Sequence, residues 1–124
     1  MKHLLITIAA LVLVGCGPSV PDNDLQEAAG LGNIEAVKQH LAAGVDVNGW
    51  GDKGNEATPL YYAAQSGHKE IAELLIANDA DVNTMNLDGK TPLDRAIKYK
   101  DTETFDLLRK HGAKTGEELK AEGK

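Results

Sequence analysis

The feature that most constrains the fold is an internal repeat with a period of about 33 residues. The tripeptide Thr-Pro-Leu stands at 58–60 and again at 91–93, 33 positions later. "GVDVN" at 44–48 is matched by "DADVN" at 79–83, 35 positions later, because the loop after the first copy is two residues longer. A third alignment pairs "EAAGLGNIEAV" at 27–37 with "YAAQSGHKEIA" at 62–72. A repeat of this length indicates stacked units, each of which buries its apolar face only against a neighbour.

Each unit has the pattern of two short helices. In "TPLYYAAQSG", Thr58 can cap a helix, Pro59 takes the first helical position, and Gly67 allows a tight turn. The following "HKEIAELLIAND" carries apolar residues at helical spacing. The first unit lacks Thr-Pro, so we expect Asn23 to cap its helix. Aromatic residues make up only 4% of the chain, so the core must be built from Ala, Leu, Ile and Val. The pattern predicts an all-α chain.

These motifs resemble the ankyrin-repeat signature, Gly-x-Thr-Pro-Leu-His-x-Ala-Ala-x-x-Gly-His, a Leu-rich second helix, and Gly-Ala-Asp-Val-Asn. The best match is "ATPLYYAAQSGHKEIAELLIANDADVN" at 57–83. The resemblance implies a solenoid of about three stacked helix-turn-helix repeats with short hairpin-like loops. The domain would cover residues 23–115, with repeats at about 23–53, 54–86 and 87–115. Tyr61 and Asp94 fill the position of the family's His, so the hydrogen-bond network attributed to that His must be altered here.

The end repeats depart from the signature towards polar residues. His40 stands where a buried Leu is usual, and Lys100 replaces the turn glycine of the third repeat. Terminal repeats need such polar substitutions on their solvent side. The charged tail at 116–124, "GEELKAEGK", could add a last helical turn or remain solvated.

The N-terminus has the pattern of a signal peptide. A basic start, "MKH", precedes an apolar run at 4–14, which is shorter than the ~20 residues of a membrane span. The next residues, "LVGC" at 13–16, resemble the lipobox of bacterial lipoproteins. That resemblance implies removal of residues 1–15 and acylation of Cys16, with residues 16–22 as a tether. Gly17 after the cysteine implies the outer rather than the inner membrane, with the domain facing the periplasm. The alternatives are a plain secretory signal and a cytosolic protein with an apolar first helix.

Composition and motifs argue against several other classes. A net charge of −6 without clustered Lys or Arg argues against nucleic-acid binding. One cysteine excludes an intramolecular disulfide. The sequence context indicates structural roles for His40, His68 and His111. No His-x-x-x-His pair and no Gly-rich phosphate loop occurs in the sequence. We therefore expect no catalytic residues, no metal site and no cofactor.

The family resemblance implies a partner-binding surface on the loop tips and inner helices. Of its members, Trp50, Met85, Leu87 and Tyr99 are expected to face solvent, and exposed aromatic residues often anchor interfaces. Trp50 could instead fold back over the first repeat. Carried over position by position, the candidates are Trp50, Met85, Leu87, Asp88 and Lys90 in the loops, and Leu31, Gln65, Ser66, Lys98 and Tyr99 on the inner helices.

The expected function is a non-catalytic protein–protein interaction module, monomeric and anchored by lipid to a bacterial membrane. Its protein partner is not identifiable from the sequence. Two alternatives remain: a structural or spacer envelope lipoprotein without a defined partner, and a small periplasmic hydrolase, which the missing catalytic constellation disfavours.

Overall fold

The computed structural model describes residues 23–50 and 57–123. The expected signal peptide, Cys16 and the tether lie outside these residues. The described part of the chain contains helices and no strands, which confirms the all-α prediction. The helices are α2 (Leu25–Leu31), α3 (Ile34–Ala42), α4 (Pro59–Gln65), α5 (Lys69–Ala77), α6 (Pro92–Lys98), α7 (Thr102–Lys110) and α8 (Gly116–Ala121).

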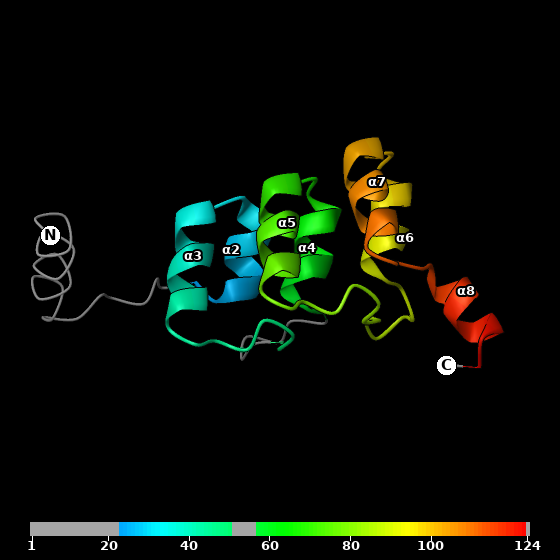
Figure 1. Cartoon of the computed structure of the whole chain (residues 1–124), viewed down its shortest axis with the longest axis horizontal. Coiled ribbons are helices and arrows are strands. Elements are labelled where there is room, and N and C mark those ends of the chain that lie inside the picture. The colour runs from blue at the N-terminus through cyan, green and yellow to red at the C-terminus, as the bar shows by residue number, and fades with distance from the viewer. Residues whose placement is uncertain (1–22, 51–56, 124) are drawn as a thin grey trace, which may run out of the picture.

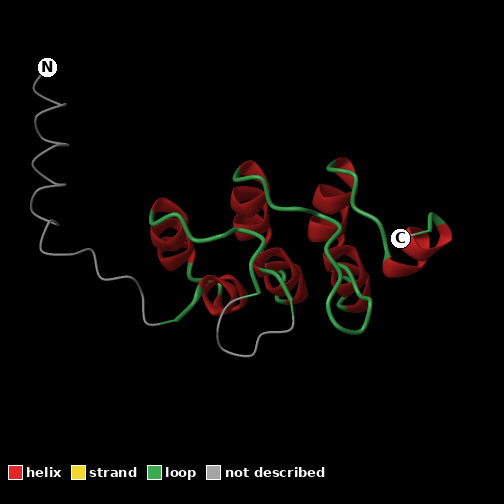
Figure 2. Ribbon diagram, turned by 90° about the horizontal axis from the view of Figure 1, so that it is seen from below, coloured by secondary structure: helices red, strands yellow, loops and turns green. Residues whose placement is uncertain are grey.

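Three helix pairs stand side by side along the molecule (Figure 1), as the repeat predicted. Figure 2 shows that they form two rows, which we call the inner helices (α2, α4 and α6) and the outer helices (α3, α5 and α7). The inner helices form a continuous contact from α2 through α4 to α6. Fully buried alanines, Ala28 and Ala29 in α2 and Ala63 and Ala64 in α4, let these helices approach closely.

Each unit adds its own layer to one shared core. Leu25, Leu60, Leu93 and Leu108 are fully buried, and they join the alanines in a single apolar cluster. Because the cluster runs through all three units, each unit depends on its neighbour for burial.

Helix starts follow the expected chemistry, with one correction. Asp24, not Asn23, is the N-cap of α2, where its Oδ1 accepts the amide of Glu27 at 2.8 Å. The backbone carbonyl of Asn23 instead lies 2.7 Å from Nε2 of the buried His40. Thr58 does begin α4, but its hydroxyl bonds that of Thr84 at 3.1 Å rather than capping the helix.

Asparagine side chains tie successive units together in the same way twice. Asn48 Oδ1 accepts the amide of Asp81 at 2.8 Å, and Asn83 Oδ1 accepts the amide of Lys114 at 2.7 Å. Both asparagines end a matched pentapeptide of the repeat. The sequence period is therefore also a period of inter-unit hydrogen bonds.

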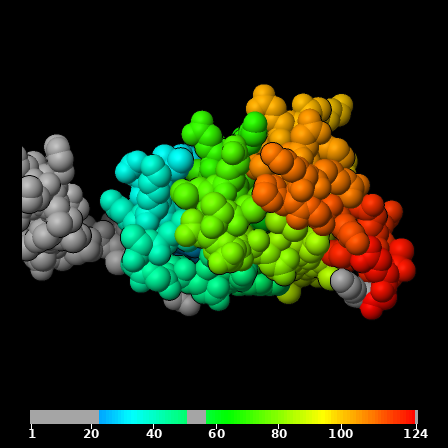
Figure 3. All heavy atoms as spheres, in the orientation of Figure 1, coloured from blue at the N-terminus to red at the C-terminus, as the bar shows by residue number. Residues whose placement is uncertain are grey.

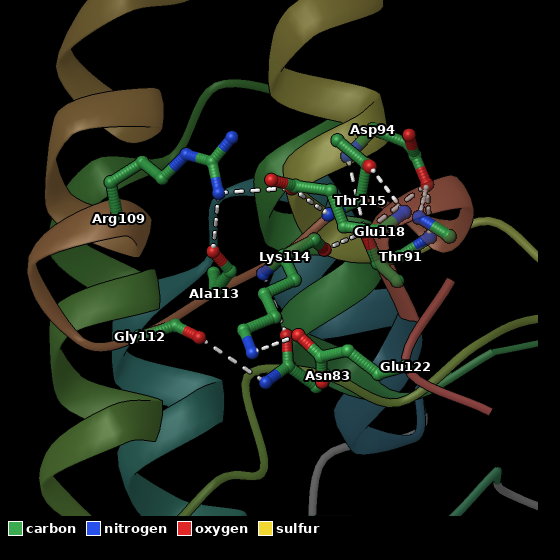
Figure 4. Close-up of polar contacts among 11 residues, drawn as sticks. Asn83, Thr91, Asp94, Arg109, Gly112, Ala113, Lys114, Thr115, Glu118 and Glu122 are labelled. Atoms are coloured by element: carbon green, nitrogen blue, oxygen red, sulfur yellow. Dashed lines mark hydrogen bonds and ion pairs between the residues drawn. The ribbon is translucent and has the colours of Figure 1, made fainter. Parts of the chain in front are cut away.

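Residues 116–121, whose conformation the sequence left open, form the helix α8 against the third unit (Figures 3 and 4). Leu119 is 3% exposed, and Arg109 bonds Glu118 at 3.0 Å. The amide of Gly116 donates to Asp94 Oδ2 at 2.8 Å. The C-terminal end of the stack is thus covered by the chain itself.

No helix among the described residues is both long enough and apolar enough to cross a lipid bilayer.

Candidate partner-binding surface

The free face of the inner helices carries side chains in rows, because matching repeat positions stack beside one another. One row contains Glu27, Tyr62 and Arg95, which occupy the same position in α2, α4 and α6. The next rows are Gly30, Gln65 and Lys98, and Leu31, Ser66 and Tyr99. Along the first row the side chain changes from acidic in α2 to aromatic in α4 and basic in α6.

The densest group of contacts on this face surrounds Arg95, and we call Tyr61, Gln65, Arg95 and Tyr99 the Arg95 cluster. The Nε and Nη2 atoms of Arg95 donate to Oε1 of Gln65 at 3.2 and 3.1 Å. Its guanidinium carbon lies 5.3 Å from the ring centroid of Tyr61 and 5.5 Å from that of Tyr99. Both distances are within the ~6 Å range of cation–π attraction. The cluster joins the second repeat unit to the third.

Tyr61 is the buried member of the Arg95 cluster. It is 5% exposed, its ring meets Tyr62 edge-on at 5.7 Å, and its hydroxyl accepts Asn86 Nδ2 at 2.9 Å. Burial raises the pKa of Tyr61 above its ordinary value of 10.0, and Arg95 opposes that rise. Tyr61 therefore remains neutral at physiological pH and holds Asn86, which anchors the adjacent loop.

A groove runs beside the cluster between α2 and α4. Leu31, Gln65 and Ser66 line it together with Tyr62 and Glu27. Three of the residues predicted from the sequence therefore do lie together. The groove and the Arg95 cluster share Gln65, so they form one continuous surface.

Charge is polarised along this surface. Asp24 and Glu27 stand at the first unit, and Arg95, Lys98 and Lys100 stand at the third. The chain as a whole carries −6, so the basic end is a local exception on an acidic protein. Such polarity favours one orientation of a charged partner over the reverse.

Comparison with known families gives the same architecture. The family model described as "Ankyrin repeats (3 copies)" matches residues 25–118. The chain belongs to the ankyrin-repeat family. Its repeats indicate a protein–protein interaction module, and the match ends within α8.

Ankyrin-repeat relatives occur in proteins of very different kinds. The chain is 37% identical over 90 residues to serine/threonine-protein kinase 12 of Arabidopsis thaliana, a match covering 73% of this chain and 19% of the kinase. It is 34% identical over 95 residues to an ankyrin repeat protein of Rickettsia bellii, covering 69% of this chain and 54% of that protein. The similarity lies in the ankyrin repeats and spans less than two thirds of either relative, so these matches carry no information about the activity in a relative's name.

The predicted loop and helix candidates differ in accessibility. Leu87 is 71% exposed, Leu31 66% and Tyr99 52%. Met85, which was expected to face solvent, is partly buried. Asp88 and Lys90 line a separate hollow with Thr115 and Lys120 of the C-terminal segment.

Trp50 is an exposed aromatic residue at the end of a loop that is fixed to the first repeat. The loop before it is held to the first ankyrin repeat, because Gln26 Nε2 donates to the carbonyl of Gly49 at 2.5 Å. The Trp50 side chain is 36% exposed, so most of its surface is covered and a third stays accessible.

Sequence reasoning missed the centre of this surface, which is Arg95 with Tyr61 and Tyr62. A signal was present, because Tyr62 and Arg95 are the variable residues directly before the alanines of their ankyrin repeats. Reading each repeat position across all three copies would have placed them in one row. It would not have shown that the guanidinium lies within 5.5 Å of two tyrosine ring centroids.

Two of the histidines considered in the sequence, His40 and His68, are packed against other parts of the stack. His40 is 3% exposed and bonded to the carbonyl of Asn23, and the His68 ring lies so close to Gly32 that a Cβ there would meet it at 2.6 Å. Within residues 23–50 and 57–123, no three His, Cys, Asp or Glu side chains are grouped to hold a metal ion.

Proposed function

We propose that this chain is a non-catalytic protein-binding module, anchored by lipid on Cys16 to the extracytoplasmic side of a bacterial membrane. The outer membrane is the proposed location, with the ankyrin repeats facing the periplasm. The observation that carries the binding role is the continuous inner-helix surface, where aromatic side chains and Arg95 meet a groove. Aromatic residues and arginine concentrate binding energy at interfaces.

The anchor rests on the sequence "LVGC" at 13–16 after a basic start and a short apolar run. Each buried methylene adds about 0.8 kcal/mol of membrane affinity, so several acyl chains hold firmly where one does not. The segment at 17–22 carries two prolines and suits a short, stiff tether.

The anchor is tested by intact mass and cell fractionation of the chain expressed in a bacterium, beside Cys16→Ser. We expect the wild type to lose residues 1–15, gain the mass of acyl chains and sediment with membranes. Cys16→Ser should lose both the acyl mass and the membrane association. A full-length, soluble wild type would contradict the anchor and leave the binding role untouched.

The binding role is tested by purifying tagged protein from its own cells with bound proteins retained. Tyr99→Ala and Trp50→Ala should each abolish co-purification of a partner while the circular dichroism spectrum stays that of the wild type. Lys38→Ala, on an exposed outer helix, is the matched control and should retain the partner. Tolerance of both aromatic substitutions would contradict a defined partner and favour a spacer.

A further inference from the structure

We propose that Arg95 is a receptor for a carboxylate, and that the partner of this surface presents an acidic side chain to it. The proposal rests on the proposed binding function and adds the chemistry of the partner. It assigns the occupant as a peptide segment with Asp or Glu at the third ankyrin repeat.

The hydrogen bonds of Arg95 leave one edge of its guanidinium for such a ligand. The side edge, made by Nε and Nη2, is occupied because both atoms donate to Oε1 of Gln65. The end edge, made by Nη1 and the second Nη2 proton, can still form two parallel hydrogen bonds. This is the geometry in which arginine binds a carboxylate most strongly.

The surroundings hold that edge in a fixed direction. The rings of Tyr61 and Tyr99 both lie within 5.5 Å of the guanidinium carbon, and Gln65 fixes rotation about its long axis. A preorganised guanidinium loses little further freedom when a carboxylate binds. Tyr99 is 52% exposed, so its ring can contact the aliphatic part of the same partner.

Charges around the cluster favour an anion at this end. Lys98 Nζ lies 5.7 Å from the Tyr99 ring centroid, which adds a second cation near the site. The carboxylate of Asp94 is engaged elsewhere, on Thr91 and the Gly116 amide. Asp88 acts electrostatically on Tyr61 and is an acidic group that would oppose an incoming carboxylate.

The test is a double-mutant cycle on a selected peptide. The full chain, immobilised, selects from a phage library of random peptides of about 12 residues, and sequencing reports which residues are enriched. We expect Asp or Glu at one position. Changing that residue to its amide should weaken binding to the wild type by about tenfold, or about 1.4 kcal/mol, because a charge-assisted bidentate pair is stronger than a neutral hydrogen bond.

The acidic peptide and its amide variant should bind the Arg95→Gln protein equally. The Arg95→Lys protein should show only part of the tenfold difference in affinity between the two peptides. Lys110→Gln, which removes one charge from an outer helix, should keep the full tenfold difference. An equal penalty on wild type and Arg95→Gln would overturn the proposal, as would selection of peptides without an enriched acid. If peptides without an enriched acid bound the wild type and lost affinity for Tyr99→Ala, the proposed binding function would stand and only the proposal of a carboxylate partner would be wrong. If no selected peptide bound the inner helices, both the proposed binding function and the carboxylate proposal would be wrong. Circular dichroism of each variant confirms that it is folded.

Discussion

At the scale of single residues, Asp94 shows how this chain replaces the His of the ankyrin signature. Its Oδ2 atom accepts the Thr91 amide at 2.9 Å, the Thr91 hydroxyl at 3.2 Å and the Gly116 amide at 2.8 Å. One carboxylate oxygen therefore starts α6 and holds the beginning of α8. Tyr61, at the matching position of the second repeat, bonds Asn86 instead.

Asp94→Ala is expected to destabilise the protein by about 1–2 kcal/mol, because Thr91, the N-cap of α6, loses the side-chain partner of its capping box. The amide of Gly116 also loses its acceptor, which adds to the effect. Urea unfolding followed by circular dichroism measures the change in the free energy of unfolding. Asp106→Ala is the control, because Asp106 is an exposed residue in the middle of α7, and its removal should leave stability within about 0.5 kcal/mol.

Gly116 offers a second prediction, because it is buried where α8 meets the loop before α6. A Cβ added there would lie 2.1 Å from the carbonyl oxygen of Gly89, which is backbone and cannot swing away. Gly116→Ala should therefore destabilise the protein, although alanine is the better helix former. Gly30→Ala is the comparison, since its Cβ would meet Tyr62 at an ordinary 3.6 Å. Gly30→Ala should stabilise α2 by about 0.5–1 kcal/mol. Equal effects of the two changes in urea unfolding would contradict this account.

At the scale of elements, α8 depends on contacts that local sequence does not contain. The helices α4 to α7 could be predicted, because the Thr-Pro-Leu starts and apolar stripes are local signals. The docking of α8 could not, since Arg109 and Asp94 reach it from other helices. The Arg95 cluster was missed for the same reason: Gln65 and Arg95 are 30 positions apart. The repeat register predicts which residues share a row, and side-chain packing decides which of them touch.

The docking of α8 should weaken in acid. The Thr115 amide, followed by the Arg109 side chain, holds the pKa of Glu118 below its ordinary value of 4.5. A carboxyl group whose pKa is lowered by folding stabilises the fold above its unfolded pKa, and that contribution is lost as the pH falls through the folded value. Amide NMR signals of residues 116–121 should therefore shift and broaden as the pH drops below 4.5. Glu118→Gln should show less pH dependence at these residues, and an unchanged profile would contradict the assignment.

At the scale of the whole molecule, each of the three repeats adds one layer to the shared core, so the stability of the stack depends on contacts between neighbours. The second repeat lies between α2 of the first and α6 of the third. The third repeat is covered on its other side by α8. We therefore expect the amides of α4 and α5 to exchange with deuterium more slowly than those of the first repeat.

Weakening the contacts of α8 tests whether the repeats unfold separately or as one unit. Leu119 is 3% exposed, and Leu119→Ala should cost about 2 kcal/mol or more through lost burial. If neighbour contacts dominate, hydrogen exchange should accelerate first in α6 and α7 and least in α2 and α3. Leu31→Ala is the control, because Leu31 is 66% exposed and its truncation should leave exchange nearly unchanged. Equal acceleration in every helix after Leu119→Ala would show that the three repeats unfold together. In that case α8 would stabilise the whole stack rather than its C-terminal end, because uncovering one repeat would open the other two.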